Sequence, residues 1–199
     1  MSDLYLLLTP VLAAGVLALV GFVGCQYLWQ IPEIPPPPVL TKVVDFVVSP
    51  DNPPNSRNNF SGWVGMVIQP ASDIKLLSLG RWCSPMNSQP HDVKVVDAAT
   101  GEDIPGAIVA ISLAGQQELT FVFVDLPAPI VLTGSQTYYL VSQEQAGGDA
   151  FLDFDITVTP SADFQVPSAV FAVETPTPPT MYQLHGAVGN CYGPVTAQY

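Results

Sequence analysis

Positive charge is the scarcest property of this 199-residue chain, which has five Lys and Arg residues against 17 Asp and Glu. The resulting formal net charge of -12 argues against nucleic-acid binding, because contact with phosphates requires a cluster of basic side chains. The same charge would repel anionic lipid headgroups, so membrane attachment would require an inserted hydrophobic segment. Charged residues of both signs make up only 11% of the chain, which is less than half of the usual share of about a quarter.

Signatures of catalysis and of zinc binding are also missing. The chain has two histidines, His91 and His185, and three cysteines. The sequence contains no nucleophile elbow, no zinc-protease helix motif and no phosphate-binding loop. No pair of Cys or His residues has the spacing of a zinc site. These absences favour a protein that is not an enzyme.

Helical periodicity is absent over any ten or more residues after Trp29. Short runs rich in β-branched and aromatic residues alternate instead with turns, in a chain with 21 prolines and 15 glycines. This pattern predicts an all-β fold, namely an antiparallel β-sandwich of Greek-key or jelly-roll type. We expect its strands at residues 43–48, 61–69, 74–82, 92–97, 107–113, 118–124, 130–132, 137–143, 151–158, 169–173 and 180–184.

One long hydrophobic run is present, between Leu4 and Trp29, and it contains no charged residue. A helix of about 20 apolar residues crosses the core of a bilayer, so residues 1–30 are predicted to form an N-terminal membrane-anchoring helix. Three alternatives stay open: a cleaved signal peptide, a lipoprotein signal ending at Cys25, and a helix that packs against copies of itself in a filament. Residues 31–42 are rich in proline and predict an extended, semi-rigid linker, which leaves residues 43–199 for the β-sandwich domain.

Candidate ligand-binding residues are aromatic and polar side chains of the β domain. Glycan-binding surfaces present flat aromatic rings to the apolar faces of sugars and surround them with polar groups. Trp63, Trp82 and Tyr139 are the candidate rings, and Tyr139 follows another tyrosine in a predicted strand, so one of the two faces outward. Arg81 and His91 are candidates for the polar rim. The alternative is structural, with the tryptophans in the core and Arg81 in an ion pair.

Three acidic residues suggest a metal site. Asp149, Asp153 and Asp155 follow one another closely after a pair of glycines. Calcium prefers several hard oxygen ligands, and a glycine turn can add backbone carbonyls. The sequence therefore suggests calcium as a cofactor at these residues, with a solvated strand face and a turn cap as the alternative.

Two of the cysteines, Cys83 and Cys191, lie in the predicted β domain. Outside the cytoplasm they could form a disulfide that closes a loop of about 110 residues. A disulfide that closes a loop of that length stabilises a fold by roughly 4–5 kcal/mol. We expect this disulfide, and the alternative is two separate buried thiols.

Short segments along the domain carry a family resemblance. They are residues 60–65 (FSGWVG), 78–82 (SLGRW), 91–101 (HDVKVVDAATG), 137–142 (TYYLVS), 147–149 (GGD) and 192–195 (YGPV), with the closing Tyr199. Together they resemble the DUF4082-type β-sandwich domains of bacterial surface and secreted proteins, over residues 43–199. That family has no settled activity, and its presence in multidomain secreted proteins implies contact with carbohydrate or matrix.

These observations predict a non-enzymatic module, anchored at the cell surface outside the cytoplasm, that recognises carbohydrate or extracellular matrix. The alternative is a structural subunit of a surface appendage, fibre or layer, assembled through the N-terminal hydrophobic helix. The expected partners are a membrane, through the run between Leu4 and Trp29, and a glycan. In the alternative, further copies of the chain are the partners.

Overall fold

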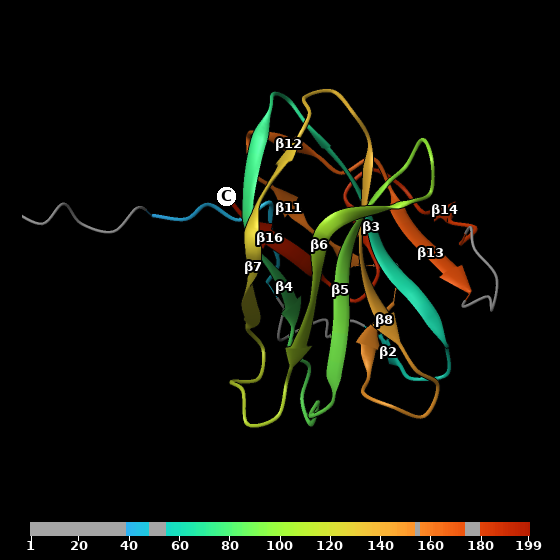
Figure 1. Ribbon diagram of the computed structural model, residues 1–199. Helices are drawn as coiled ribbons and strands as arrows, with labels where there is room; N and C mark the ends of the chain where they lie inside the picture. The colour runs from blue at the N-terminus through green and yellow to red at the C-terminus, as the bar shows by residue number, and fades with distance from the viewer. Residues whose placement is uncertain (1–38, 48–54, 154–155, 174–179) are drawn as a thin grey trace, which may run out of the picture. The chain divides into compact units, whose positions relative to one another are not determined.

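Antiparallel strands and turns make up the part of the chain that the computed structural model describes, which is residues 39–47, 55–153, 156–173 and 180–199. From Leu40 to Tyr199 these residues belong to one unit (Figure 1). The described ranges contain no helix, and so none long and apolar enough to cross a membrane. The predicted anchor between Leu4 and Trp29 lies outside the described residues.

Two main sheets contain the long strands (Figure 1). The larger sheet has the order β14-β13-β3-β8-β5-β6, and β12 also pairs with β3. Its strands are β3 (Gly62–Pro70), β5 (Pro90–Asp97), β6 (Asp103–Ser112), β8 (Tyr138–Glu144), β12 (Phe164–Gln165), β13 (Ala169–Val173) and β14 (Gln183–His185). The smaller sheet has the order β16-β4-β7 and consists of β4 (Ile74–Trp82), β7 (Phe121–Leu132) and β16 (Val195–Gln198).

Three two-stranded ribbons complete the described strands. They pair β1 (Val44–Asp45) with β11 (Thr159–Pro160), β2 (Ser56–Arg57) with β9 (Phe151–Leu152), and β10 (Ile156–Thr157) with β15 (Asn190–Cys191). Every pairing in the described part of the chain is antiparallel. The predicted all-β fold with antiparallel sheets is therefore confirmed.

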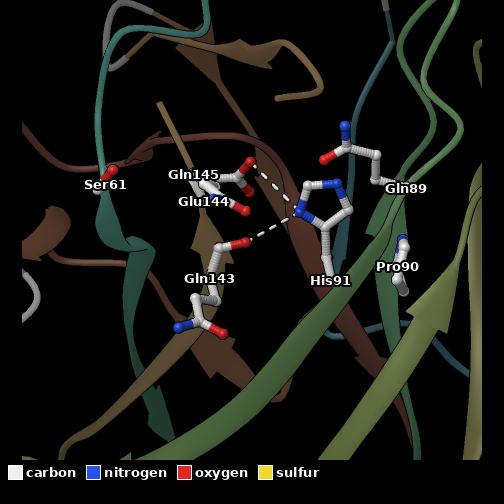
Figure 2. Close-up of a pocket in the computed structure, with 7 residues that line it drawn as sticks. All are labelled: Ser61, Gln89, Pro90, His91, Gln143, Glu144 and Gln145. Atoms are coloured by element: carbon white, nitrogen blue, oxygen red, sulfur yellow. Dashed lines mark hydrogen bonds and ion pairs between the residues drawn. The ribbon is translucent and has the colours of Figure 1, made fainter. Parts of the chain in front are cut away.

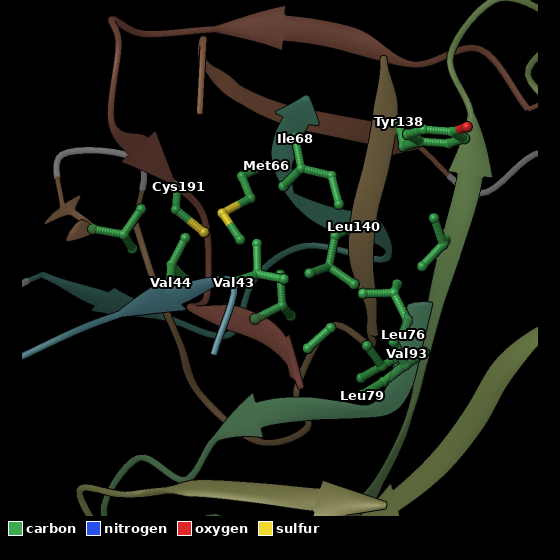
Figure 3. Packing of buried hydrophobic residues seen from close by; sticks show 14 of the residues in the cluster. Val43, Val44, Met66, Ile68, Leu76, Leu79, Val93, Tyr138, Leu140 and Cys191 are labelled. Carbon is green, nitrogen blue, oxygen red and sulfur yellow. The ribbon is translucent and has the colours of Figure 1, made fainter. Parts of the chain in front are cut away.

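The main hydrophobic core contains side chains from both sheets (Figure 3). The larger sheet contributes Met66, Val93 and Leu140, and the smaller sheet contributes Leu76 and Leu79, all of them fully buried. Because successive side chains of a strand point to opposite faces, only alternate residues of each strand can belong to this core. The result is a sandwich-like arrangement in which each sheet covers the apolar face of the other.

The outer face of the larger sheet has an apolar cluster of its own. Val67, Val96, Val141 and Val170 are buried in this cluster, with Trp63, Tyr139 and Tyr182 packed against it. The central strands of this sheet are thus apolar on both faces, which explains why their sequences show nearly continuous hydrophobic runs instead of a clean alternation.

Strand β7 differs from the prediction, because the sequence predicts two strands, at 118–124 and 130–132, where the structure has one. Pro127 and Pro129 lie inside β7, opposite a shift in the register of β4 between Leu76 and Ser78. An edge strand tolerates proline because the missing N–H faces away from its only partner. Conversely, the single strand predicted at 151–158 is two short strands, β9 and β10, in different ribbons.

The last strand, β16, is absent from the sequence-based prediction although it lies beside β4. Its four residues follow Gly193 and Pro194 and are too few to show a periodic pattern. On its other side, Thr41 and Tyr199 exchange two backbone hydrogen bonds of 3.1 Å, and the N–H of Val43 donates to the carbonyl of Ala197 at 2.8 Å. The first described residues thereby pair with the last ones.

Candidate functional site

A polar pocket opens where β5 begins and β8 ends (Figure 2). These two strands are antiparallel neighbours in the larger sheet, so the first residues of one lie beside the last residues of the other. The polar pocket has a volume of about 350 Å³ and is lined by Ser61, Gln89, Pro90, His91, Gln143, Glu144 and Gln145.

The alternation of side chains along β8 decides whether a residue lines the polar pocket with its side chain or with its main chain. Ser142 and Glu144 point into the sandwich, and the residue between them, Gln143, has the opposite orientation. Figure 2 shows the backbone carbonyl of Gln143 directed toward His91 while its side-chain amide points away. Gln143 therefore lines the pocket with its main chain.

A buried ion pair between Arg81 and Glu144 lies next to the polar pocket. The Nη2 atom of Arg81 is 3.0 Å from both carboxylate oxygens of Glu144, and its Nε donates to Oε1 at 3.2 Å. The hydroxyl of Ser142 donates to the same Oε1 at 2.9 Å. The side chains of Arg81 and Glu144 are only 2% and 1% exposed. Because Arg81 belongs to β4 and Glu144 to β8, this pair connects the two sheets.

His91 has an oxygen partner at each ring nitrogen. Its Nδ1 lies 2.9 Å from the carbonyl of Gln143 and 3.4 Å from Oε2 of Glu144, and its Nε2 lies 3.3 Å from Oδ2 of Asp149. All of these partners are hydrogen-bond acceptors when the carboxyl groups are ionised. This arrangement suits a fixed hydrogen-bonding group better than a general base, which needs a ring nitrogen directed at a substrate.

Asp149 holds the loop that forms one wall of the polar pocket. Its Oδ2 accepts hydrogen bonds from the backbone N–H groups of Ser88 at 2.8 Å and Gln89 at 2.7 Å. Next to it, the side chain of Asn87 donates to the carbonyl of Ala150 at 2.8 Å and accepts from the N–H of Ala150 at 3.1 Å. These bonds fix the position of Gln89 before any ligand arrives, which lowers the entropic cost of binding.

The predicted calcium ligands have separate surroundings. Asp149 accepts the loop hydrogen bonds, Asp153 pairs with Arg57 at 3.3 Å, and Asp155 lies outside the described residues. Among the residues that the structure describes, no three His, Cys, Asp or Glu side chains are grouped to hold a metal ion. Calcium binding that involves Asp155 stays a prediction.

Of the two residues predicted to form a polar rim, His91 lines the polar pocket and Arg81 does not. His91 lines the polar pocket, as a rim residue would, but its ring is almost entirely buried. Arg81 is not at a rim, because it lies inside the sandwich and contacts Glu144. In the sequence, only one loop separates Arg81 from His91, so their proximity could be predicted. Nothing in the sequence indicates that the carboxylate of Glu144 contacts both of them.

None of the predicted aromatic rings lines the polar pocket. Trp82 is a core residue, packed edge-on against Phe46 and Phe121 with ring centres 5.0 and 5.2 Å away. Trp63 and Tyr139 belong to the outer face of the larger sheet, where neither lines the polar pocket. The three aromatic candidates therefore do not form one binding surface with His91.

The outer-face residues also have internal partners. The ammonium group of Lys94 lies 3.9 Å from the ring centre of Trp63, and Tyr139 packs against Tyr182 with ring centres 4.9 Å apart. Lys94 also donates to the carboxylate of Asp103 at 2.6 Å. These contacts account for the aromatic side chains as part of the outer-face packing.

Ser61, Gln89 and Gln145 line the polar pocket although the sequence did not single them out. Each lies in or beside a turn, where polar residues are expected in any β protein. A usable signal would have been the concentration of amide side chains at the ends of two strands. That signal requires the pairing of β5 with β8, which the sequence does not provide.

The structure has Cys83 and Cys191 as separate, fully buried free thiols in place of the predicted disulfide. Burial raises the pKa of both thiols, and raises that of Cys191 from 9.0 to about 12. The sulfur of Cys191 lies 3.0 Å from the carbonyl of Tyr192. Both side chains therefore serve as small apolar core residues.

Alkaline pH is expected to destabilise the fold through Cys191. In the unfolded chain this thiol loses its proton near pH 9, whereas the folded chain keeps it up to a pKa of about 12. The folded state thus binds more protons in this window, so the free energy of unfolding falls with rising pH, by up to about 1.4 kcal/mol per pH unit. Urea unfolding of wild type and Cys191→Ala at several pH values measures the slope. An equal slope in both proteins would contradict the assignment.

No protein-family model matches the chain, and no curated protein matches it significantly. The resemblance to DUF4082-type domains therefore stays a prediction, and the functional argument depends on the polar pocket.

Proposed function

We propose that the chain is a non-enzymatic recognition module that binds carbohydrate, or a polysaccharide of the extracellular matrix, in the polar pocket. In this proposal the domain has the connectivity of a Greek-key or jelly-roll sandwich and is held at the outer surface of a cell. The N-terminal hydrophobic run between Leu4 and Trp29 forms the anchoring helix. The resemblance to DUF4082-type domains supports the same class of ligand.

The observation that carries the proposal is a pocket with neutral hydrogen-bonding groups around a rigid base. Sugars are recognised by groups that donate to and accept from hydroxyls, and the amide of Gln89 and the hydroxyl of Ser61 do both. The buried pair of Arg81 with Glu144 and the loop hydrogen bonds of Asp149 hold the walls in place. A pocket of about 350 Å³ matches the size of small-ligand sites.

Catalysis is a weaker interpretation of the same residues. A hydrolase acting on sugars needs two carboxyl groups free to exchange protons or attack carbon. Glu144 instead receives donors from Arg81 and Ser142, and Asp149 receives backbone N–H groups. Carboxylates committed to internal donors are suited to holding a site in shape.

The test is a glycan-binding screen with the full-length chain in a detergent that has no sugar headgroup. We expect at least one neutral oligosaccharide to bind. Gln89→Leu should weaken that binding roughly tenfold, since a lost hydrogen bond costs about 1 kcal/mol or slightly more. The matched control is Gln116→Leu in the exposed turn between β6 and β7, which should leave affinity unchanged.

Calcium is tested in the same screen by adding EDTA. Binding that survives EDTA would agree with a site made by the polar pocket alone. Loss of binding on EDTA would instead indicate the metal site predicted at Asp149, Asp153 and Asp155. Failure of every glycan to bind a folded chain would reject the proposed function.

The second candidate is a structural subunit of a surface assembly, and one edge of the larger sheet favours it. The edge strand β14 and its flanking segments expose Met181, Leu184 and Val188, at 70%, 62% and 80%. Unprotected edges with exposed apolar side chains favour association. Electron microscopy and sedimentation of the full-length chain would detect filaments or layers, and a monomer at high concentration would reject this candidate.

A further inference from the structure

Four of the five Lys and Arg residues of this chain are already committed to its own carboxylates. All five lie in the described part of the chain, and none of them lines the polar pocket. Four are in ion pairs: Lys42 with Asp45, Arg57 with Asp153, Arg81 with Glu144, and Lys94 with Asp103. The fifth, Lys75, is an exposed residue of β4. An acidic ligand in the polar pocket would therefore meet no Lys or Arg side chain, and both ring nitrogens of His91 already face oxygen atoms of the protein.

Backbone donors beside the polar pocket are committed in the same way. Two successive N–H groups, of Ser88 and Gln89, converge on one oxygen, an arrangement that binds anions in many proteins. In this chain the oxygen is Oδ2 of Asp149, which also faces Nε2 of His91. The carboxylate of Asp149 thus occupies the position that an anionic ligand group would need.

The carboxylates beside the polar pocket are equally unsuited to a cationic ligand. Glu144 accepts hydrogen bonds from Arg81 and Ser142 and faces His91. Oδ2 of Asp149 accepts from the backbone N–H groups of Ser88 and Gln89 and also faces Nε2 of His91. Arg81 balances the charge of Glu144, and backbone N–H groups solvate the carboxylate of Asp149. The groups that face a ligand are uncharged: the amide of Gln89, the segment at Gln145, and the hydroxyl of Ser61, which accepts from the N–H of Ala146 at 3.0 Å and keeps its own O–H to donate.

We infer that the polar pocket selects uncharged saccharides and rejects acidic ones such as uronic acids. This inference rests on the proposed function and narrows its ligand class. Two effects act together: the local anion-binding groups hold Asp149 and Glu144, and the net charge of -12 repels an anion from the surroundings. Removal of a carboxylate from water without a partner is costly, so the discrimination is expected to be large.

The experiment compares gluco- and galacto-oligosaccharides with the same compounds oxidised at C6 to the uronic acid. Affinities for the full-length chain are measured at about 0.02 M and about 0.5 M NaCl, where the Debye length is roughly 20 Å and 4 Å. We expect the uronate to bind at least tenfold more weakly than the neutral compound at low salt. At high salt the difference in affinity between the neutral compound and the uronate should become smaller, because salt screens the repulsion by the surrounding charge.

A variant separates the local effect from the net charge. Gln145→Lys places a cation at the rim of the polar pocket, and Gln116→Lys places the same charge in the exposed turn between β6 and β7. We expect the first variant to bind the uronate at least fivefold more tightly than wild type, and the second to leave the preference unchanged.

Failure of the inference can be told apart from failure of the proposed function. A uronate that binds wild type as tightly as the neutral compound, or more tightly, overturns the inference and leaves glycan recognition in place. An equal gain of uronate binding in both lysine variants also overturns it, because selection would then come from net charge and not from the polar pocket. Absence of binding by every neutral and acidic compound removes the proposed function and the inference together.

Discussion

Replacement of Arg81 by methionine is expected to lower the free energy of unfolding by about 3–5 kcal/mol, the cost of leaving one member of a buried ion pair without its partner. Methionine retains an unbranched apolar stem but removes the guanidinium group and its three hydrogen bonds to Glu144, whose side chain is 1% exposed. Domains of this size are stable by about 5–15 kcal/mol, so the loss is a large fraction of the total. Guanidinium unfolding followed by tryptophan fluorescence measures it.

The double variant Arg81→Met, Glu144→Leu tests the reason for that loss. It removes both charges at once, and apolar replacement of a whole buried pair is often close to neutral. We expect it to recover most of the stability lost in Arg81→Met. As a control, Lys42→Met removes one member of the half-exposed pair with Asp45 and should cost less than about 1 kcal/mol. A double variant that is even less stable than Arg81→Met would contradict this explanation, because the loss would then not come from an unpaired buried charge.

Replacement of Gly65 by alanine is expected to cost about 3 kcal/mol or more, at the upper end of the range for overpacking. A Cβ atom at Gly65 would lie 2.1 Å from the carbonyl oxygen of Leu140 and 2.9 Å from Cα of Val141. Both are main-chain atoms of β8, and the carbonyl of Gly65 also accepts a hydrogen bond from the N–H of Tyr192. Relief of the overlap would therefore require the central strands of the larger sheet to separate.

Gly80 provides the matched control for Gly65, because it also lies inside a long strand. A Cβ atom there would meet the ring of Phe123 at 2.6 Å. That ring is only partly buried and can rotate away, so Gly80→Ala should cost only about 1 kcal/mol. Thermal unfolding of the two variants beside wild type compares them directly. Equal melting temperatures for the two variants would contradict this explanation of Gly65.

Local sequence is sufficient for strands that are uninterrupted by proline and bounded by turn residues. β4 at Ile74–Trp82 and β13 at Ala169–Val173 have the predicted bounds, since each is a continuous run with a break at both ends. β7 and β16 could not be predicted from local patterns. Prolines interrupt the first, and the second is too short to show a period. In both cases the pairing with β4 decides the outcome, and pairing is a long-range property.

The candidate site depends on long-range contacts to a greater extent than the fold does. His91 could be predicted as a polar contact residue because a polar residue at the start of a strand is conspicuous in the sequence. In the structure it lines the polar pocket. Trp82 was predicted as a binding residue, but Phe46 and Phe121, which are distant in sequence, pack against its ring and bury it. Glu144 was not selected, since only the approach of β4 makes it the partner of Arg81.

The contact between Arg81 and Glu144 also constrains the order of folding. The two residues are 63 positions apart and belong to different sheets, so neither sheet can desolvate its charged side chain until the other has formed and docked. A partly folded chain with one complete sheet would therefore be penalised, and assembly of the sandwich becomes closer to all-or-none. The kinetic consequence is a slow, highly cooperative folding reaction, because distant strands must find one another before the charges are neutralised.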